Sequence, residues 1–280
     1  MIVRENIIET EGYDIENIIS NSEVKCKPED IIFFDLEHYV YKKPKCIGVF
    51  GACIYNNSDK KLYVTQYMIE NKGEVVDILL LAKKYFKKMK KIKKSVIVTF
   101  SGNNDFTVIK YLFQKFNIYF DFDKEFKSID IQKEYEKQMN TSIGLKNLEK
   151  IFNIYREGDV ISGSNLAKTF HKVLKDREYI ERMPKEKIES ILVYNEQDVV
   201  NLFNILINWK KYINNNNEDE INDIDNLNNE NSSIINNSYN DNEENLEEEK
   251  DNLESDNDNL QINNDEDEQK MLEEQTLTTE

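Results

Sequence analysis

The stretch from Ile31 to His38 reads IIFFDLEH and constrains the fold more than any other part of the chain. Four consecutive apolar residues, two of them β-branched, are typical of a strand that is buried on both faces. The run ends in two carboxylates, Asp35 and Glu37, which lie on the same side of the strand because strand side chains alternate. Like charges on one face repel each other unless a cation or a proton lies between them. The stretch therefore predicts a divalent metal site.

An acidic pair after a strand is often only a solvated strand end, and so short a motif is a weak signal alone. A metal site needs further carboxylates. Asp105 is one candidate, because it follows the strand-like run SVIVTF (95–100) and a polar turn, and precedes a helical pattern. Open α/β sheets build their sites at the carboxyl ends of strands. The alternative for Asp105 is a helix cap.

A second candidate, Asp198, lies in the last helical segment, which Pro184 opens and which extends to about Trp209. Apolar residues at intervals of three and four place Asp198 in the middle of an inward-facing stripe. A buried lone carboxylate is costly unless it is paired or bound to metal. Tyr194 lies one turn earlier, so its phenol and the carboxylate face the same site.

Five strands are predicted in all. They are residues 31–37, 46–55, 62–69, 95–100 and 126–131, and the first three, joined by short connections, form an antiparallel meander. Helices are predicted over 74–92, 106–113, 145–152 and 165–174, in addition to the last one. Residues 1–29 are a lead-in without an assigned structure. The sequence thus predicts an α/β fold with a mixed five-stranded sheet flanked by helices.

Composition divides the chain near Tyr212. Residues 213–280 carry a net charge of −21, are rich in Asn and contain almost no aromatic residue, which predicts a disordered acidic tail. Residues 1–212 carry a net charge of +4, so the acidic whole-chain charge of −17 does not exclude a nucleic-acid partner. The predicted domain spans 30–212. The tail is either a solubilising extension or a competitor of nucleic acid for basic side chains.

The helix over 74–92 has a lysine-rich second half. Six of its lysines, Lys83, Lys84, Lys87, Lys88, Lys90 and Lys91, are either a solvated face or a patch that attracts nucleic-acid phosphates. Three cysteines without paired spacing indicate reduced thiols. The first residues are interrupted by acids and no apolar run is long enough to span a bilayer, so a cytoplasmic protein without membrane contact is expected.

The order of these motifs carries a family resemblance. The first motif, FFDLE, contains the pattern D-x-E, and the second, FSGNNDF, contains an Asp at the start of a predicted helix. The segment GLKNLEKIF is a predicted helix between these motifs and the last one, YNEQDVVNL, which contains the pattern Y-x-x-x-D. Over roughly residues 30–210 the chain resembles the DEDD 3′–5′ exonuclease superfamily in its tyrosine-bearing branch, and most closely the YprB-type ribonuclease-H-like domains. It departs from the common pattern at His38, where Thr often stands, and at Asn104, where an aromatic residue often precedes the Asp.

The resemblance implies a ribonuclease-H-like fold and a two-metal nuclease that acts on single-stranded DNA or RNA. By the resemblance, the catalytic set is Asp35, Glu37, Asp105, Tyr194 and Asp198, and its four carboxylates bind two Mg²⁺ or Mn²⁺ ions, hard cations that prefer oxygen ligands. Tyr194 would orient the attacking water. Two alternatives stay open: a nucleic-acid-binding module that keeps the fold and does not cut, and a metal-dependent phosphatase.

Overall fold

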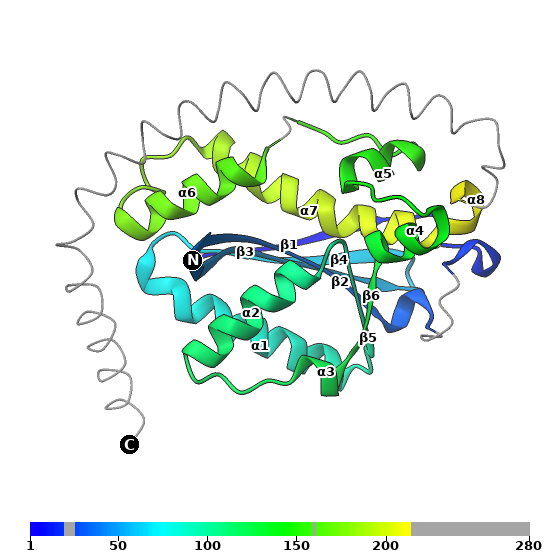
Figure 1. The fold of residues 1–280 in the computed structure, drawn as a ribbon, viewed down its shortest axis with the longest axis horizontal. Helices are drawn as coiled ribbons and strands as arrows, with labels where there is room; N and C mark the ends of the chain where they lie inside the picture. The colour runs from blue at the N-terminus through cyan, green and yellow to red at the C-terminus, as the bar shows by residue number, and fades with distance from the viewer. Residues whose placement is uncertain (20–25, 159–160, 214–280) are drawn as a thin grey trace. The chain divides into compact units, whose positions relative to one another are not determined.

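The computed structural model describes residues 1–19, 26–158 and 161–213. Nearly all of the predicted acidic tail, residues 214–280, lies outside the described residues. The remaining chain forms a mixed sheet flanked by helices, as predicted (Figure 1). Within the described residues, no helix combines the length and apolar composition needed to cross a membrane.

The sheet has six strands in the order β1-β4-β3-β2-β5-β6. β2 pairs antiparallel with β3, β3 with β4 and β4 with β1, whereas β5 runs parallel to both β2 and β6. The predicted meander is confirmed. The bounds of the strands are β1 Ile2–Glu9, β2 Ile31–Tyr41, β3 Lys43–Asn56, β4 Lys61–Met68, β5 Val96–Thr99 and β6 Lys127–Asp130.

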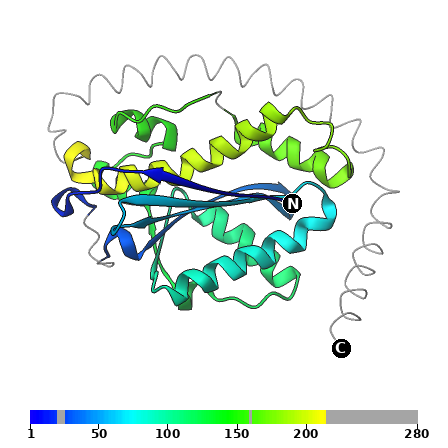
Figure 2. The ribbon, with the colours of Figure 1, turned by 180° about the vertical axis from the view of Figure 1, so that it is seen from behind.

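The prediction of five strands was wrong by one, because β1 lies in the segment that had no assigned structure. In β1 the side chains that face inward and outward do not sort by polarity: Asn6 is half-buried, whereas Val3 and Ile7 are more than half exposed. The alternating pattern that reveals a half-buried strand is therefore missing. Backbone pairing along the whole of β4 holds the strand at the sheet edge (Figure 2), and Arg4 forms an ion pair with Glu189 of the long helix α7, Lys185–Ile207.

Helices cover both faces of the sheet (Figure 1). On one face lie α1 and α2, with α3 beside them, and on the other α7 with α4, α5 and α6. The helix bounds are α1 Val75–Lys91, α2 Asn103–Lys115, α3 Phe122–Glu125, α4 Ile131–Met139, α5 Leu145–Ile151, α6 Gly163–Lys175, α7 Lys185–Ile207 and α8 Trp209–Ile213. Short 3₁₀ helices span Ile15–Asn17, Pro28–Asp30 and Lys72–Glu74.

β2 lies between these two helical layers, and its four apolar residues explain why. Ile31 to Phe34 are fully buried. Phe34 packs against Phe86 of α1, with ring centroids 5.4 Å apart, and Phe33 packs against Phe203 of α7 at 5.7 Å. Since alternate side chains anchor the strand to opposite layers, Asp35 continues the Phe33 side and faces α7. The burial of the apolar run therefore fixes where the carboxylates point.

Candidate metal-binding active site

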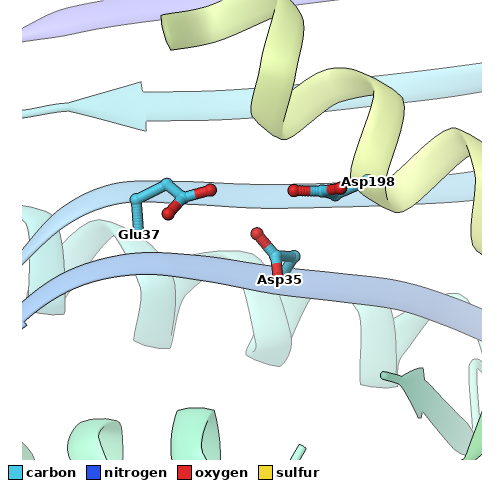
Figure 3. A group of neighbouring side chains, drawn as sticks. All are labelled: Asp35, Glu37 and Asp198. Atoms are coloured by element: carbon cyan, nitrogen blue, oxygen red, sulfur yellow. The ribbon is translucent and has the colours of Figure 1, made fainter. Parts of the chain in front are cut away.

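Three carboxylates meet between β2 and α7. Asp35 and Glu37 come from β2 and Asp198 from the middle of α7, and one oxygen of each lies within 4.8 Å of the others (Figure 3). The two β2 residues share a face because they are two positions apart, and Asp198 is brought to them by the apolar stripe of α7. Ile191 and Leu202 of that stripe are 1% exposed, and Asp198 itself is 5% exposed. The predicted convergence of these three residues is present.

Burial makes ionisation of this group unfavourable. Loss of solvation raises the pKa of Asp35 to about 6 and that of Asp198 to about 8. The pKa of Glu37 is raised by burial first and then by the charges of Asp35 and Asp198. Arg156 opposes all three shifts through its positive charge. The cluster therefore favours either bound protons or a bound cation at neutral pH.

Asp35 is held in place by a buried amide relay. Asn195 donates a 2.9 Å hydrogen bond from Nδ2 to Asp35 Oδ2, and Gln66 on β4 donates from Nε2 to Asn195 Oδ1 at 2.8 Å. Gln66 also donates to the carbonyl of Leu192, and neither amide side chain is exposed to solvent. The amide of Asn195 fits because Gly51 on β3 has no side chain: a Cβ there would lie 2.1 Å from Asn195 Oδ1. The relay fixes the orientation of one carboxylate oxygen.

Asp105 lies next to these carboxylates but outside the group that meets within 4.8 Å. It is 6% exposed, and its pKa is raised by burial and then by the charges of Asp35, Asp130 and Asp198. The cap of α2 is Gly102 and has no side-chain hydrogen bond, so the structure does not support the alternative of Asp105 as a helix cap.

The turn before Asp105 is held by Asp130, a residue for which no role was predicted. Asp130, at the end of β6, accepts backbone hydrogen bonds from Ser101 at 3.0 Å and Gly102 at 3.1 Å. Ser101 has a positive φ of 54°, a conformation that is uncommon for a residue with a side chain. The carboxylate of Asp130 thus stabilises the turn from which α2 begins, and with it the position of Asp105.

Tyr194 lies close to two cations. The Nζ of Lys146 is 5.2 Å from its ring centroid and the guanidinium carbon of Arg156 is 5.1 Å from it. Burial raises the pKa of the Tyr194 phenol, and the charges of Asp198 and Glu37 raise it further. The phenol therefore stays protonated at neutral pH, where it can donate and accept hydrogen bonds but does not readily take up a proton.

No catalytic group was predicted between β6 and α7. In the structure, however, this segment supplies three charged residues at the site. Lys146 and Glu149 lie on α5, and Arg156 follows that helix. Arg156 donates to both oxygens of Glu149 and forms an ion pair with Asp198. The one sequence signal was Glu149, a charged residue beside Leu148 in a helix whose apolar residues face inward. Its partner Arg156 lies seven residues later, and no periodic pattern in the sequence marks that residue.

The six lysines predicted to bind phosphates lie on the exposed side of α1, apart from Lys83, which is half-buried. Shallow hollows along this surface are lined by lysines and by the aromatic pair Tyr119 and Phe120. α1 covers the face of the sheet opposite to α7 (Figure 1). The lysines therefore lie across the sheet from the carboxylates and are not part of the same site.

The donor set at the carboxylates fits a hard divalent cation. The ligand atoms are carboxylate oxygens, which Mg²⁺ and Mn²⁺ prefer, and no sulfur or imidazole lies in the group. Three acidic side chains meet within 4.8 Å, and the guanidinium in contact with them, that of Arg156, is shared between Asp198 and Glu149, so negative charge remains for a cation to neutralise. The chemistry of the group thus agrees with the metal site that the sequence predicts.

Comparison with known families agrees with this geometry. Residues 32–210 match the family RNase_H_2, described as RNase_H superfamily. The chain belongs to the RNase_H superfamily. The matched region begins at the second residue of β2 and ends just after α7, so it contains all the carboxylates described above. No curated protein matches the sequence.

Membership confirms the ribonuclease-H-like fold class predicted from the motifs. Members of the superfamily are commonly nucleases that act on nucleic acids and use divalent metals. The narrower assignment to YprB-type exonucleases stays a prediction.

Proposed function

We propose that this chain is a metal-dependent nuclease, and specifically a 3′–5′ exonuclease that hydrolyses phosphodiester bonds of single-stranded DNA or RNA. The observation that carries the proposal is the meeting of Asp35, Glu37 and Asp198 within 4.8 Å, one helical turn from Tyr194. A ribonuclease-H-like fold with a tyrosine one turn before the helix carboxylate corresponds to the tyrosine-bearing DEDD pattern found in the sequence. The same pattern supports a place among the YprB-type domains.

In this proposal Asp35, Glu37 and Asp198, together with Asp105, hold two Mg²⁺ or Mn²⁺ ions. When bound, the ions supply an activated water and stabilise the departing oxygen of the phosphodiester. Asn195 keeps one oxygen of Asp35 fixed for its ligand role. The turn that Asp130 stabilises positions Asp105 near the other three carboxylates.

Tyr194 orients the attacking water through its hydroxyl. Its raised pKa supports a positioning role, since a neutral phenol donates and accepts hydrogen bonds but does not abstract a proton readily. The cations of Lys146 and Arg156 beside the ring hold it in place.

The lysines of α1 give the protein a second, sequence-independent contact with the nucleic-acid backbone, on the other side of the sheet. Lys84, Lys87, Lys88 and Lys91 are exposed, so their charges can reach phosphates, whereas Lys90 forms an ion pair with Glu125. The affinity for a long strand should then fall steeply with salt, whereas cleavage of a very short oligonucleotide should not depend on these side chains. A charge-reversal of Lys87 and Lys91 tests this contact.

One observation favours a second candidate, a nucleic-acid-binding module that does not cut. Asp198 already has a cationic partner in Arg156, which offsets part of its negative charge without a metal ion. In that case the protein binds single strands and the carboxylates have no catalytic role. Metal-dependent cleavage separates the two candidates.

The test uses purified protein with end-labelled single-stranded DNA and RNA, in Mn²⁺, in Mg²⁺ and in chelator. The proposal predicts ladders that shorten from the 3′ end, only with metal, and absent for Asp198→Asn. Asp123→Asn is a matched control, because Asp123 is an exposed carboxylate paired with Lys110. Binding without cleavage under all conditions would favour the second candidate. Hydrolysis of a small phosphate ester in preference to the oligonucleotides would favour a phosphatase.

A further inference from the structure

Arg156 is anchored beside the carboxylate group by a residue that is not part of it. Its Nε donates to Glu149 Oε2 at 2.7 Å, and its Nη2 donates to Glu149 Oε1 at 2.6 Å. Glu149 is 2% exposed, and its Oε1 also accepts a 2.8 Å hydrogen bond from Asn201 Nδ2. A planar guanidinium that makes two parallel bonds to a buried carboxylate is fixed in orientation. Arg156 therefore keeps its place whether or not Asp198 holds it.

The third nitrogen of this guanidinium has no hydrogen-bond partner among the residues that the structure describes. Nη1 of Arg156 is buried and makes no hydrogen bond with any described residue. A buried donor without an acceptor is destabilising, the more so when it is charged, so natural proteins rarely leave one unless something else binds there. Nη2 of the same planar group contacts Asp198. An acceptor at Nη1 would thus lie next to the carboxylate group.

The unpaired donor matches an anion that must come close to carboxylates. A phosphodiester approaching Asp35, Glu37 and Asp198 is repelled by their charges, and its non-bridging oxygens need donors on the protein side. Arginine suits this role because its planar donors match phosphate oxygens. Lys146, whose Nζ lies 5.2 Å from the Tyr194 ring, adds a second positive charge near the carboxylates, since its pKa, which burial lowers, responds to the charges of Asp198 and Glu37. Arg156 and Lys146 therefore supply positive charge beside the carboxylates.

We propose that Arg156 binds the substrate, donating from Nη1 to a non-bridging oxygen of the scissile phosphate, and that Glu149 is the residue that positions it. This inference rests on the proposed nuclease function and names a substrate contact within that site. The ion pair with Asp198 can be given up while the Glu149 anchor holds the guanidinium in place. The competing explanation is that Arg156 only balances the charge of Asp198.

The test measures binding rather than cleavage. Adenosine 5′-monophosphate and adenosine are titrated in Mg²⁺ by calorimetry into the full chain and into Arg156→Gln, Arg156→Lys and Glu149→Gln. We expect Arg156→Gln to weaken the nucleotide about tenfold to a hundredfold, the loss of one charge-assisted hydrogen bond, and to leave adenosine unchanged. Arg156→Lys keeps the charge without the planar donors, so its nucleotide affinity should lie between those of the wild type and Arg156→Gln. Glu149→Gln should weaken the nucleotide in the same selective way.

Arg182→Gln is the matched control, because Arg182 is an exposed arginine in ion pairs with Asp176 and Glu178. An unchanged nucleotide affinity in Arg156→Gln, or an equal loss for nucleotide and nucleoside, would overturn the inference. If Arg156→Gln does not fold, Arg156→Lys decides the question by the same comparison. If the wild-type chain cleaves oligonucleotides but Arg156→Gln binds the nucleotide with wild-type affinity, the role of Arg156 is overturned and the nuclease function is not. Phosphate-selective binding through Arg156 without any cleavage would support that role and overturn the nuclease.

Discussion

Asn195 donates a 2.9 Å hydrogen bond to Asp35 across the gap between α7 and β2, and so ties the two elements that bring the carboxylates together. The bond lowers the pKa of Asp35, against the larger effect of burial, which raises it. Asn195 is one residue from Tyr194 and three from Asp198, so the same helical turn carries a proposed ligand, the proposed water-orienting group and the residue that orients Asp35. One rigid element thus sets the geometry of the site.

Asn195→Ala should weaken Mn²⁺ binding by about 10- to 100-fold, as removal of a group that orients a ligand commonly does. Without the bond Asp35 gives up its proton less readily, and Gln66 loses one of its two acceptors, which should lower the free energy of unfolding by about 1–3 kcal/mol. Calorimetric titration and denaturant unfolding measure the two effects. Asn204→Ala, further along the same helix, should change neither, and Mn²⁺ affinity of the wild-type value in Asn195→Ala would refute the positioning role.

Gly51→Ala should disturb the same relay through steric contact alone. The added Cβ would lie 2.1 Å from Asn195 Oδ1 and 2.7 Å from its Cγ, so the amide must move away from Asp35. We expect the fold to lose about 1–3 kcal/mol, as overpacked cores do, with a fall in Mn²⁺ affinity. Thermal unfolding with and without Mn²⁺ measures both. Gly163→Ala is the control, because a Cβ there meets nothing within 4 Å, and equal behaviour of the two variants would contradict the prediction.

Two patterns in the sequence were sufficient to predict the buried central strand and the three carboxylates that the structure brings together. The apolar run of Ile31 to Phe34 identifies a buried strand, and the strict alternation of a strand then places Asp35 and Glu37 on one face. Asp198 stands out because a carboxylate interrupts an apolar helical stripe. These signals are local, since each depends on spacing within one element.

The residues that sequence reasoning missed depend on contacts between distant elements. Gln66, Glu149 and Arg156 are brought to the site by β4, by α5 and by the segment after it. Apart from the charge of Glu149 beside Leu148, nothing within those segments marks these residues as functional. β1 was missed for a different reason, because backbone pairing with β4 holds it and its outward residues Val3 and Ile7 are apolar. Hydrogen bonds that join residues far apart in sequence have no periodicity to detect.

Tyr194→Phe should lower the cleavage rate by about 10- to 1,000-fold with Mn²⁺ affinity within about twofold of wild type, since positioned acid–base and hydrogen-bond groups contribute on that scale. The ring remains close to Lys146 and Arg156, so the fold should keep its stability. Single-turnover cleavage and calorimetric Mn²⁺ titration separate the two quantities. A variant that cleaves at the wild-type rate would remove the assignment.

The stability of the metal-free protein should fall as pH rises from about 4 to about 8. The folded state raises the pKa of Asp35 to about 6 and of Asp198 to about 8 from an ordinary value of 3.8, so in this window it holds protons that the unfolded chain has released. Each such proton contributes about 1.4 kcal/mol per pH unit. In denaturant unfolding at several pH values, the free energy of unfolding of Asp198→Asn should fall less steeply with pH than that of the wild type. A wild-type stability that rises with pH relative to Asp198→Asn would contradict the account.

Mn²⁺ should reverse this loss. The ion binds only deprotonated carboxylates, so the increase in melting temperature on adding Mn²⁺ should be larger near pH 8 than near pH 6. Asp198→Asn should show little increase at either pH. The wild-type protein without added metal gives the baseline for each pH.

The most direct measurement is the initial rate at which the wild-type chain and Asp198→Asn release nucleotides from a single-stranded oligonucleotide labelled at its 5′ end, in Mn²⁺, after chelator, and after Mn²⁺ is added back. The account predicts cleavage by the wild type that stops with chelator and returns with Mn²⁺, and a rate at least about a hundredfold lower for Asp198→Asn at every step. Equal rates for the two proteins, or cleavage that persists in chelator, would contradict the claim that these carboxylates form the active site of a metal-dependent nuclease.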